Sequence, residues 1–366
     1  MTFYFLTLFG FYFVLLLVLR IGWSKAFALK EKNPILKKDF ISVVIPIRNE
    51  ERNIGTLVSG LANQNYEASN FEVIVVNDHS TDDSIQRTKE KQEIFTNLTT
   101  LSLGENEFGK KAALTRGISF AKGEIVATTD ADCILPPEWL ATINSAFQND
   151  QINMAAGMVK VADDKKFFSR WQAMEFASVM GTGAAAFGFN KPFMCNGANL
   201  SFRKEVFHKV NGYEGNEHIA SGDDEFLMRK IHDRFPDSIR MMNSIVVTQP
   251  QVSPTDFLQQ RIRWASKWKG NPSIPAKLLA VFIFLLEASW VFLISFLNHD
   301  HWVLLLIVVV KIAADLLFLL PVFRFMKIKF TLISFLGLQF LYPFYVILVG
   351  LLAPWSSYRW KDRKIL

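Results

Sequence analysis

The sequence predicts an α/β domain, with a mostly parallel sheet and helices on both faces, between apolar segments that cross a membrane. Two observations predict this class. Strand-like and helix-like patterns alternate between residues 40 and 150 of the 366-residue chain, and such alternation produces parallel strands joined by helices. Long apolar segments lie near both ends of the chain, and a membrane span needs roughly 20 such residues.

The first apolar segment, Phe3–Leu19, is expected to be an uncleaved anchor within residues 1–22. Met1 and Thr2 carry no positive side chain, and the following Arg20–Trp23 offers no small-residue cleavage site, so a signal peptide is disfavoured. Basic residues follow the segment: Arg20, Lys25, Lys30, Lys32, Lys37 and Lys38. The positive-inside rule then places the N-terminus outside and the domain in the cytoplasm.

The soluble domain is expected over residues 38–250. Four β-branched runs are expected to be strands: Ile41–Pro46, Phe71–Val76, Leu98–Leu103 and Ile125–Thr129. Helical spacing of apolar residues predicts helices over Glu50–Gln64, Lys110–Ala121 and Pro137–Phe147. A further helix is expected to take Ser80 as its N-cap, with Asp82 and Asp83 in its first turn.

Residues 276–356 are expected to form the C-terminal membrane region, followed by a basic tail at 357–366. Its apolar segments are Leu278–Leu297, Trp302–Phe323 and Phe330–Pro354, broken near Asn298–His301 and Arg324–Lys329. The first two predict a hairpin. Because Gly337 and Pro343 interrupt the third, it is either re-entrant or interfacial, or a full span that breaks the positive-inside rule. The region therefore holds two or three spans.

Charge narrows the range of partners. The net charge is +6, and the basic residues lie near the membrane segments, as anionic lipid headgroups favour. The soluble domain has no stripe of basic residues of the kind that would indicate binding to nucleic acid. Cys133 and Cys195 are the only cysteines, which excludes a disulfide framework and fits a cytoplasmic domain. Lys311 and Asp315 lie at i,i+4 inside an apolar span, so we expect them to pair or to face protein.

Acidic residues follow two of the predicted strands. Asp130 and Asp132 come directly after the fourth strand, and Asp78 follows the second. Ligands bind at this edge of an open α/β sheet, and paired carboxylates suit a divalent metal that holds a diphosphate. Asp78 could accept a hydrogen bond from a ribose or a base. The alternatives are a solvated loop for the pair and a helix cap for Asp78.

Two more polar motifs begin helices. Gly109-Lys110-Lys111 could form a phosphate site at a helix N-terminus, although a solvated turn has the same composition. Gly222-Asp223-Asp224-Glu225 precedes an apolar helical pattern. These acids either complement the helix dipole or include a general base whose pKa its acidic neighbours raise.

The segment 251–275 combines Gln260-Arg261-Ile262-Arg263-Trp264 with Lys267, Trp268 and Lys269. Such a basic and aromatic amphipathic pattern just before a membrane span predicts an interfacial helix. That prediction does not account for the particular order of Gln, Arg and Trp.

Taken in order, these motifs resemble the family 2 glycosyltransferases, and specifically their membrane-embedded branch. That branch includes cellulose, hyaluronan and poly-N-acetylglucosamine synthases and the ceramide glucosyltransferases. The family pattern is an aspartate, an Asp-x-Asp, a third acidic motif and Gln-x-x-Arg-Trp. Here Asp224 precedes Gln260 by 36 positions. The resemblance covers about Phe40 to Gly270 and implies a GT-A fold.

The resemblance implies a donor site. Pro46, Asn49 and Glu50 would line the base of the nucleotide, and Asp78 would hold the uridine of a UDP-sugar. Lys110 or Lys111, together with Arg263, would lie near the diphosphate. Asp130 and Asp132 match the Asp-x-Asp motif, which binds Mg²⁺ or Mn²⁺, with Asp132 as the direct ligand.

The resemblance also implies an acceptor site and a base. Asn196, Gly197 and Asn199 match a segment near the sugar, and Gln260 and Trp264 would belong to the acceptor site, with Trp264 capping it. Asp224 matches the catalytic base. Asp223 replaces the usual glutamate before it, so either of the two aspartates is a candidate for the base.

The implied reaction is an inverting transfer from a nucleotide sugar to an acceptor hydroxyl. The acceptor is either a lipid or lipid-linked molecule or, in a processive synthase, a growing polysaccharide. The small number of membrane segments favours the lipid. A nucleotide-sugar-binding subunit without catalysis is the alternative of another class, and the presence of Asp132, Asp224 and Trp264 argues against it.

Overall fold

The computed structural model describes residues 2–28, 37–216, 222–266, 274–295, 301–355, 358–360 and 363–365. The chain divides into two compact units. One, the sheet unit, comprises Lys25–Lys160 and Ala186–Gln249. The other, the helical unit, comprises Met1–Ser24, Val161–Ala185 and Pro250–Leu366. The sheet unit therefore begins before the expected domain at 38–250, and it lacks Val161–Ala185 and Pro250 of that domain.

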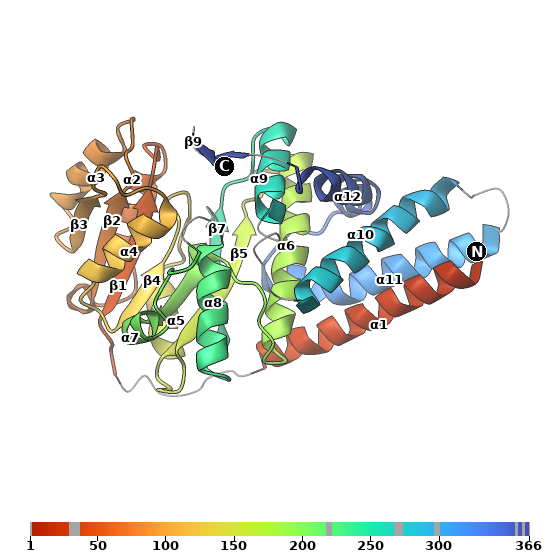
Figure 1. Cartoon of the computed structure of the whole chain (residues 1–366), viewed down its shortest axis with the longest axis horizontal. Helices are drawn as coiled ribbons and strands as arrows, with labels where there is room; N and C mark the ends of the chain where they lie inside the picture. The colour runs from red at the N-terminus through yellow and green to blue at the C-terminus, as the bar shows by residue number, and fades with distance from the viewer. Residues whose placement is uncertain are drawn as a thin grey trace. The chain divides into compact units, whose positions relative to one another are not determined.

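The sheet unit is built on a seven-stranded mixed sheet with strand order β3-β2-β1-β4-β6-β5-β7 (Figure 1). Pairs β1–β2, β1–β4 and β2–β3 are parallel, whereas β6 runs antiparallel to β4 and to β5. The strands are β1 Ile41–Ile47, β2 Phe71–Asn77, β3 Leu98–Ser102, β4 Ile125–Thr128, β5 Met154–Val161, β6 Leu200–Arg203 and β7 Ile239–Thr248. The predicted α/β class with a mostly parallel sheet is confirmed.

Helices cover the faces of this sheet. They are α2 Ile54–Ala62, α3 Ser84–Gln92, α4 Lys110–Phe120, α5 Trp139–Ala146, α7 Lys204–Lys209 and α8 Asp223–Arg234. Strand β2 is buried at every position, as expected for a central parallel strand covered on both sides. Helix α4 packs on β1 and β2, and a side chain at its Gly117 would lie 2.4 Å from Val44. The glycine therefore allows the close approach of helix and sheet.

The expected strands between residues 40 and 130 all form, but three helix starts differ. Helix α5 begins at Trp139 rather than Pro137. Helix α2 begins at Ile54 rather than Glu50, because residues 50–53 form a turn closed by the Asn53 N–H on the Glu50 carbonyl. The expected N-cap at Ser80 was wrong. Helix α3 begins at Ser84, and the Ser80 hydroxyl instead accepts a hydrogen bond from the Asn49 N–H.

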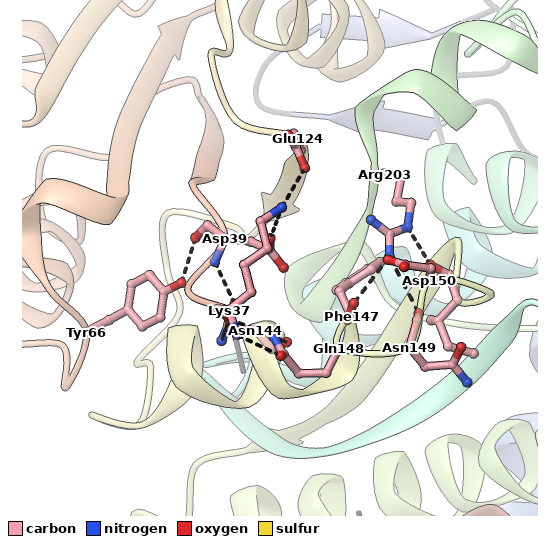
Figure 2. Close-up of polar contacts among 11 residues, drawn as sticks. Lys37, Asp39, Tyr66, Glu124, Asn144, Phe147, Gln148, Asn149, Asp150 and Arg203 are labelled. Carbon is pink, nitrogen blue, oxygen red and sulfur yellow. Dashed lines mark hydrogen bonds and ion pairs between the residues drawn. The ribbon is translucent and has the colours of Figure 1, made fainter. Parts of the chain in front are cut away.

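At the edge where β1 and β4 begin, polar contacts hold the segment that leads into β1 (Figure 2). Lys37 lies 2.8 Å from Asp39 and 3.4 Å from Glu124, which precedes β4. The Asp39 backbone donates to the Asn144 side chain at 2.9 Å and accepts from the Tyr66 hydroxyl at 2.6 Å. These contacts tie the start of β1 to α5 and to the start of β4.

Arg203, at the end of the antiparallel β6, reaches the same edge (Figure 2). Its guanidinium donates to the carbonyls of Ile152 at 2.9 Å and Phe147 at 3.2 Å. The side chain therefore satisfies carbonyls that follow helix α5, and it fixes the turn between α5 and β5. This edge of the sheet is closed by structural contacts.

The helical unit contains α1 Thr2–Ala26, α6 Phe167–Phe187, α9 Pro254–Ser266, α10 Ile274–Ser295, α11 His301–Phe325 and α12 Leu332–Leu352, and the hairpin of β8 Tyr358–Trp360 and β9 Arg363–Ile365. The last two residues of α6 belong to the sheet unit. Among the described residues, α1, α11 and α12 are long and apolar enough to cross a membrane. This agrees with an N-terminal anchor and with two of the expected C-terminal spans.

Helix α12 is continuous through Gly337 and Pro343. A proline inside a helix frees the carbonyl four residues earlier, here that of Gln339, and the Trp290 indole of α10 donates to this carbonyl at 3.3 Å. Helix α10 thus supplies a donor for the carbonyl that Pro343 leaves without its usual partner within the helix. Of the segments discussed from sequence, Lys267–Lys269, Asn298–Asp300 and parts of the tail at 357–366 lie outside the described residues.

Polar side chains from four helices meet inside the helical unit. Lys311 lies 3.1 Å from Asp315 on α11, and both are buried, so the expected pairing is confirmed. The Lys311 ammonium also donates to Gln339 of α12 at 2.8 Å, and Tyr12 of α1 donates to Asp315. Glu287 of α10 is 3% exposed beside them. We refer to these five residues as the polar cluster.

We expect Gly123→Ala to destabilise the sheet unit. A Cβ at this position would lie 2.6 Å from the Phe40 carbonyl oxygen and 2.7 Å from the Ser42 nitrogen, and backbone cannot move aside cheaply. Overpacking of this kind costs about 1–3 kcal/mol. The thermal midpoint of the far-ultraviolet circular dichroism signal, measured in detergent, should fall.

Gly60→Ala is the matched control, since nothing lies within 4 Å of a Cβ at Gly60 in helix α2. Alanine is favoured over glycine in a helix by roughly 0.8–1.0 kcal/mol, so this variant should melt at an equal or higher temperature. If both variants had the same thermal midpoint, the inference that a Cβ at Gly123 clashes with the backbone would be wrong.

Candidate functional site

The carboxyl ends of β2, β1 and β4 lie side by side at one edge of the sheet, opposite the edge in Figure 2. Asp78 follows β2 and is buried, with 1% exposure. Its carboxylate accepts from the Gly109 N–H at 3.0 Å and contacts the His79 ring at 3.2 Å. Gly109 has φ +93°, which glycine adopts without strain. The turn before α4 is therefore fastened to the end of β2.

The loops after β1 and β2 are bonded to each other. Arg48 donates to the carbonyls of Asp78 at 2.8 Å and His79 at 3.0 Å. The Asn49 side chain accepts from the Thr81 N–H at 2.9 Å, and the Glu50 N–H donates to Ser84 at 2.6 Å. Pro46 lies in β1, half-buried. The residues expected at the nucleotide base thus form one preorganised edge with Asp78.

Lys110, the first residue of α4, stands among three carboxylates. Its ammonium lies 2.7 Å from Asp130 and 3.5 Å from Asp223. Burial lowers the pKa of Lys110, but Asp130, Asp223 and Asp224 together raise it by more. The lysine is therefore a permanent cation. It brings together an acid that follows β4 and acids that begin α8, about ninety residues later in the sequence.

Asp224 lies beside the segment that precedes β6. It accepts from the Gly197 N–H at 2.9 Å and from the Glu225 N–H at 2.8 Å, so two backbone groups fix the carboxylate. Asn196 caps the 3₁₀ turn η2, Gly197–Asn199, by accepting from the Ala198 N–H. A Cβ on Gly197 would lie 3.1 Å from the Asp223 carboxylate. Glycine here lets the backbone approach both acids.

Asp132 is held by a residue that the sequence did not indicate. The Thr248 hydroxyl, at the end of β7, donates to Asp132 at 3.0 Å. The neighbouring Cys133 thiol is buried, and burial, followed by the charges of Asp132 and Asp130, raises its pKa, so it stays protonated at neutral pH. Thr248 lies 116 residues from Asp132, and no spacing rule connects them.

Two other residues singled out from sequence have structural contacts. The Lys111 ammonium donates to the Asn216 carbonyl and lies over the Phe226 ring, and the residue is 8% exposed. Of the two lysines, Lys110 is the one that faces the acids. Asn199 accepts from the Trp139 indole at 2.9 Å and donates to the Met158 carbonyl at 2.9 Å, so it braces the sheet.

Asp130 and Asp132 offer hard oxygen atoms, which suit Mg²⁺ or Mn²⁺. Within the described ranges, no group of three or more His, Cys, Asp or Glu side chains could hold a metal ion by itself. Magnesium is commonly bound by one or two carboxylates together with the phosphates of a substrate. The donor set therefore fits a metal that arrives with a diphosphate.

The remaining predicted site residues, Gln260, Arg263 and Trp264, lie on α9 in the helical unit. The expected interfacial segment 251–275 is thus helical over Pro254–Ser266. Within this helix, Arg261 is buried with 4% exposure, although its sequence context indicated a basic surface.

Residues 42–210 match the family described as Glycosyl transferase family 2. Glycosyltransferase AglE of Haloferax volcanii is 27% identical over 202 residues, covering 53% of this chain and 62% of that protein. Glucosyl-dolichyl phosphate glucuronosyltransferase of the same organism is 25% identical, covering 48% and 56%. The beta-monoglucosyldiacylglycerol synthase of a Nostoc species is 27% identical, covering 38% and 30%. The chain thus spans less than two thirds of the length of these relatives.

A solved structure with a similar fold is the mannosyltransferase PcManGT from Pyrobaculum calidifontis, in complex with GDP-Man and Mn²⁺. It has a TM-score of 0.54 and 16% identity, with 96% of both chains covered. At this identity the likeness shows a shared fold, which is the GT-A type.

We expect Thr248→Val to weaken metal binding at Asp132. Partners that orient a metal ligand typically contribute 10–100-fold to metal affinity, and we expect a loss of roughly that size. Binding would be measured as the disappearance of the free Mn²⁺ electron paramagnetic resonance signal in the presence of UDP.

Thr248→Ser retains the hydroxyl and should bind Mn²⁺ as the unchanged protein does, whereas Asp132→Ala should remove the binding. Equal Mn²⁺ affinity in the valine and serine variants would contradict the role of the Thr248 hydroxyl.

Proposed function

Because residues 42–210 of this chain belong to the family 2 glycosyltransferases, we propose that the protein transfers a sugar from a nucleotide sugar to a hydroxyl of a lipid or lipid-linked acceptor. The proposed transfer inverts the anomeric configuration. The protein acts at the cell membrane, with the sheet unit in the cytoplasm, where the basic residues after α1 favour it.

One observation carries this proposal: the Lys110 ammonium joins Asp130 and Asp223, while Asp224 is held 2.9 Å from the Gly197 N–H. Groups of three kinds meet at the edge where α/β sheets bind ligands. They are a cation, hard metal ligands and an oriented carboxylate. Transfer from a diphosphate sugar can use all three, because charge builds on the leaving diphosphate while the acceptor loses a proton.

The residues divide the work as follows. Asp78 and the loop with Asn49 and Glu50 hold the nucleoside, and Lys110 stabilises the negative charge on the diphosphate. Asp130 and Asp132 would hold a divalent cation, which supplies further positive charge beside the leaving group. Arg263 of α9 is assigned to the diphosphate by its motif.

Asp224 is the proposed general base. Each carboxylate oxygen can accept more than one hydrogen bond, so the contacts from Gly197 and Glu225 leave Asp224 able to accept the proton of an acceptor hydroxyl. That oxygen then attacks the anomeric carbon from the face opposite the leaving group, and no covalent intermediate is required. Asp223 is engaged with Lys110 at 3.5 Å, which favours Asp224 over its neighbour.

The acceptor is proposed from the membrane helices and from the relatives. Two relatives are named for a dolichyl phosphate-linked sugar and for a diacylglycerol lipid, and α1, α11 and α12 would place the enzyme beside such molecules. The proposed donor is a UDP-sugar, as the Asp78 motif implies. The neighbouring structure in complex with GDP-Man makes a guanosine donor the comparison to include.

The function is tested by incubating purified protein with Mn²⁺, total membrane lipids and radiolabelled UDP-glucose, UDP-N-acetylglucosamine or GDP-mannose. We expect label from one UDP-sugar to enter the organic phase on lipid extraction, and Asp224→Asn to prevent this. Label in an insoluble polymer would instead identify a polysaccharide synthase. Nucleotide binding without any transfer or hydrolysis would leave only a binding subunit.

We expect Asp224→Asn to lower the transfer rate by about 10²–10⁴-fold, the usual contribution of a general base. Affinity for UDP, measured by calorimetry, should change little, because the donor contacts lie on other loops. Asp223→Asn is the matched neighbour. If it lowered the rate more than Asp224→Asn while UDP still bound, Asp223 would be the base.

A further inference from the structure

A buried ion pair lies in the helical unit, whereas the acids of the candidate site belong to the sheet unit. Arg261 of α9 donates through Nε to Glu175 of α6 at 3.1 Å, and its Nη2 contacts the other carboxylate oxygen. Glu175 is 0% exposed and Arg261 is 4% exposed. The two-point contact fixes the plane of the guanidinium as well as its position.

The guanidinium lies between two rings of its own helix. Its centre is 4.4 Å from the Phe257 ring and 4.3 Å from the Trp264 ring. These residues stand four positions before and three positions after Arg261, so all three share one side of α9. Arg261 also donates to the Gln260 side chain. One buried cation therefore touches two residues of the Gln-x-x-Arg-Trp motif.

A third helix completes the arrangement. The Tyr345 hydroxyl of α12 donates to Glu175 at 3.1 Å, so the carboxylate joins α6, α9 and a membrane-span candidate. Gln172 of α6 and the backbone of Gln251, just before α9, exchange two hydrogen bonds of 2.9 Å. The segment from Gln251 to Arg261 is thus fixed to α6 at both of its ends.

Stability alone does not account for this pair. Removing two charges from water costs several kcal/mol each, and well-packed apolar side chains of similar size are often as stable or more stable. What apolar residues lack is direction, because only the ion pair sets the rotation of the guanidinium against Trp264 and Gln260. The pair is therefore suited to orient these two side chains.

We propose that Arg261 and Glu175 are positioning residues, which hold Gln260 and Trp264 in the orientation that the acceptor requires. This inference rests on the proposed function, since the motif assigns Gln260 and Trp264 to the acceptor. The pair acts through those side chains, and the donor site of the sheet unit contains neither Arg261 nor Glu175.

The test separates positioning from stability. Glu175→Gln leaves the buried Arg261 without its counter-charge, so the thermal midpoint of this variant should fall. The triple variant Glu175→Leu, Arg261→Met and Tyr345→Phe removes all three polar partners and fills the space with apolar groups. We expect the triple variant to recover the thermal midpoint but not the orientation of Gln260 and Trp264.

The deciding measurement is steady-state kinetics with donor and acceptor varied separately. The triple variant should show an acceptor KM raised by about tenfold to 10²-fold, the scale of a displacement of about 1 Å, with an unchanged donor KM. Asp163→Asn is the control, because it removes the partner of the partly exposed Arg170 on α6 and should change neither KM.

Two results would overturn the positioning role. One is a stable triple variant with an unchanged acceptor KM, and the other is a loss that affects donor and acceptor equally. Failure of the proposed function is distinguishable, since the unaltered protein would then transfer no sugar in the same assay.

Discussion

The proposed active site depends on the ion pairs that the Lys110 ammonium makes with Asp130 and Asp223. Asp130, Asp223 and Asp224 approach one another at the end of the sheet, and like charges in a partly buried site repel strongly. A permanent cation 2.7 Å from Asp130 and 3.5 Å from Asp223 compensates that repulsion. The same cation would meet the diphosphate of a donor, so the residue that compensates the repulsion between the acids would also favour an anionic ligand. Gly109, with its positive φ, starts the helix at the point where this lysine can reach the acids.

The two edges of the sheet have different tasks. At the edge that Figure 2 shows, Lys37, Asp39 and Arg203 form hydrogen bonds and ion pairs with neighbouring side chains and backbone groups. These contacts stabilise the fold. At the opposite edge, Asp78 and Asp130 follow strands and Asp224 lies in the first turn of a helix. Their partners include Lys110, the His79 ring and backbone N–H groups. This division follows from parallel pairing, because parallel strands place all their carboxyl ends together. The proposed sugar transfer would accordingly take place at one edge of the sheet.

Local patterns predicted most of the frame and many of the acids. Strands β1 to β4 are β-branched runs between polar turns, and Asp78 and Asp130 stand directly after two of them. Features that depend on distant partners could not be predicted in this way. Thr248 reaches Asp132 across 116 residues, and Ser80 lost its expected role as a cap because Asn49, 31 residues earlier, uses its hydroxyl. Arg261 was expected at a basic surface, because Glu175, the residue that compensates its charge, lies 86 residues away in the sequence. Strands β5 to β7 also escaped notice, as their pairing combines segments far apart in the chain.

The polar cluster has a consequence for how the protein is made. Tyr12 and its partner Asp315 are 303 residues apart, and the sheet unit is encoded between them. At a synthesis rate of about 5–20 residues per second, roughly 15–60 s separate the emergence of the two residues from the ribosome. The tyrosine hydroxyl of the first helix therefore lacks that acceptor while the sheet unit is synthesised. The contacts of Lys311 and Asp315 with α1 and α12 can form only after most of the chain has been made, so a chain truncated before α11 would keep α1 but lack the partner of Tyr12.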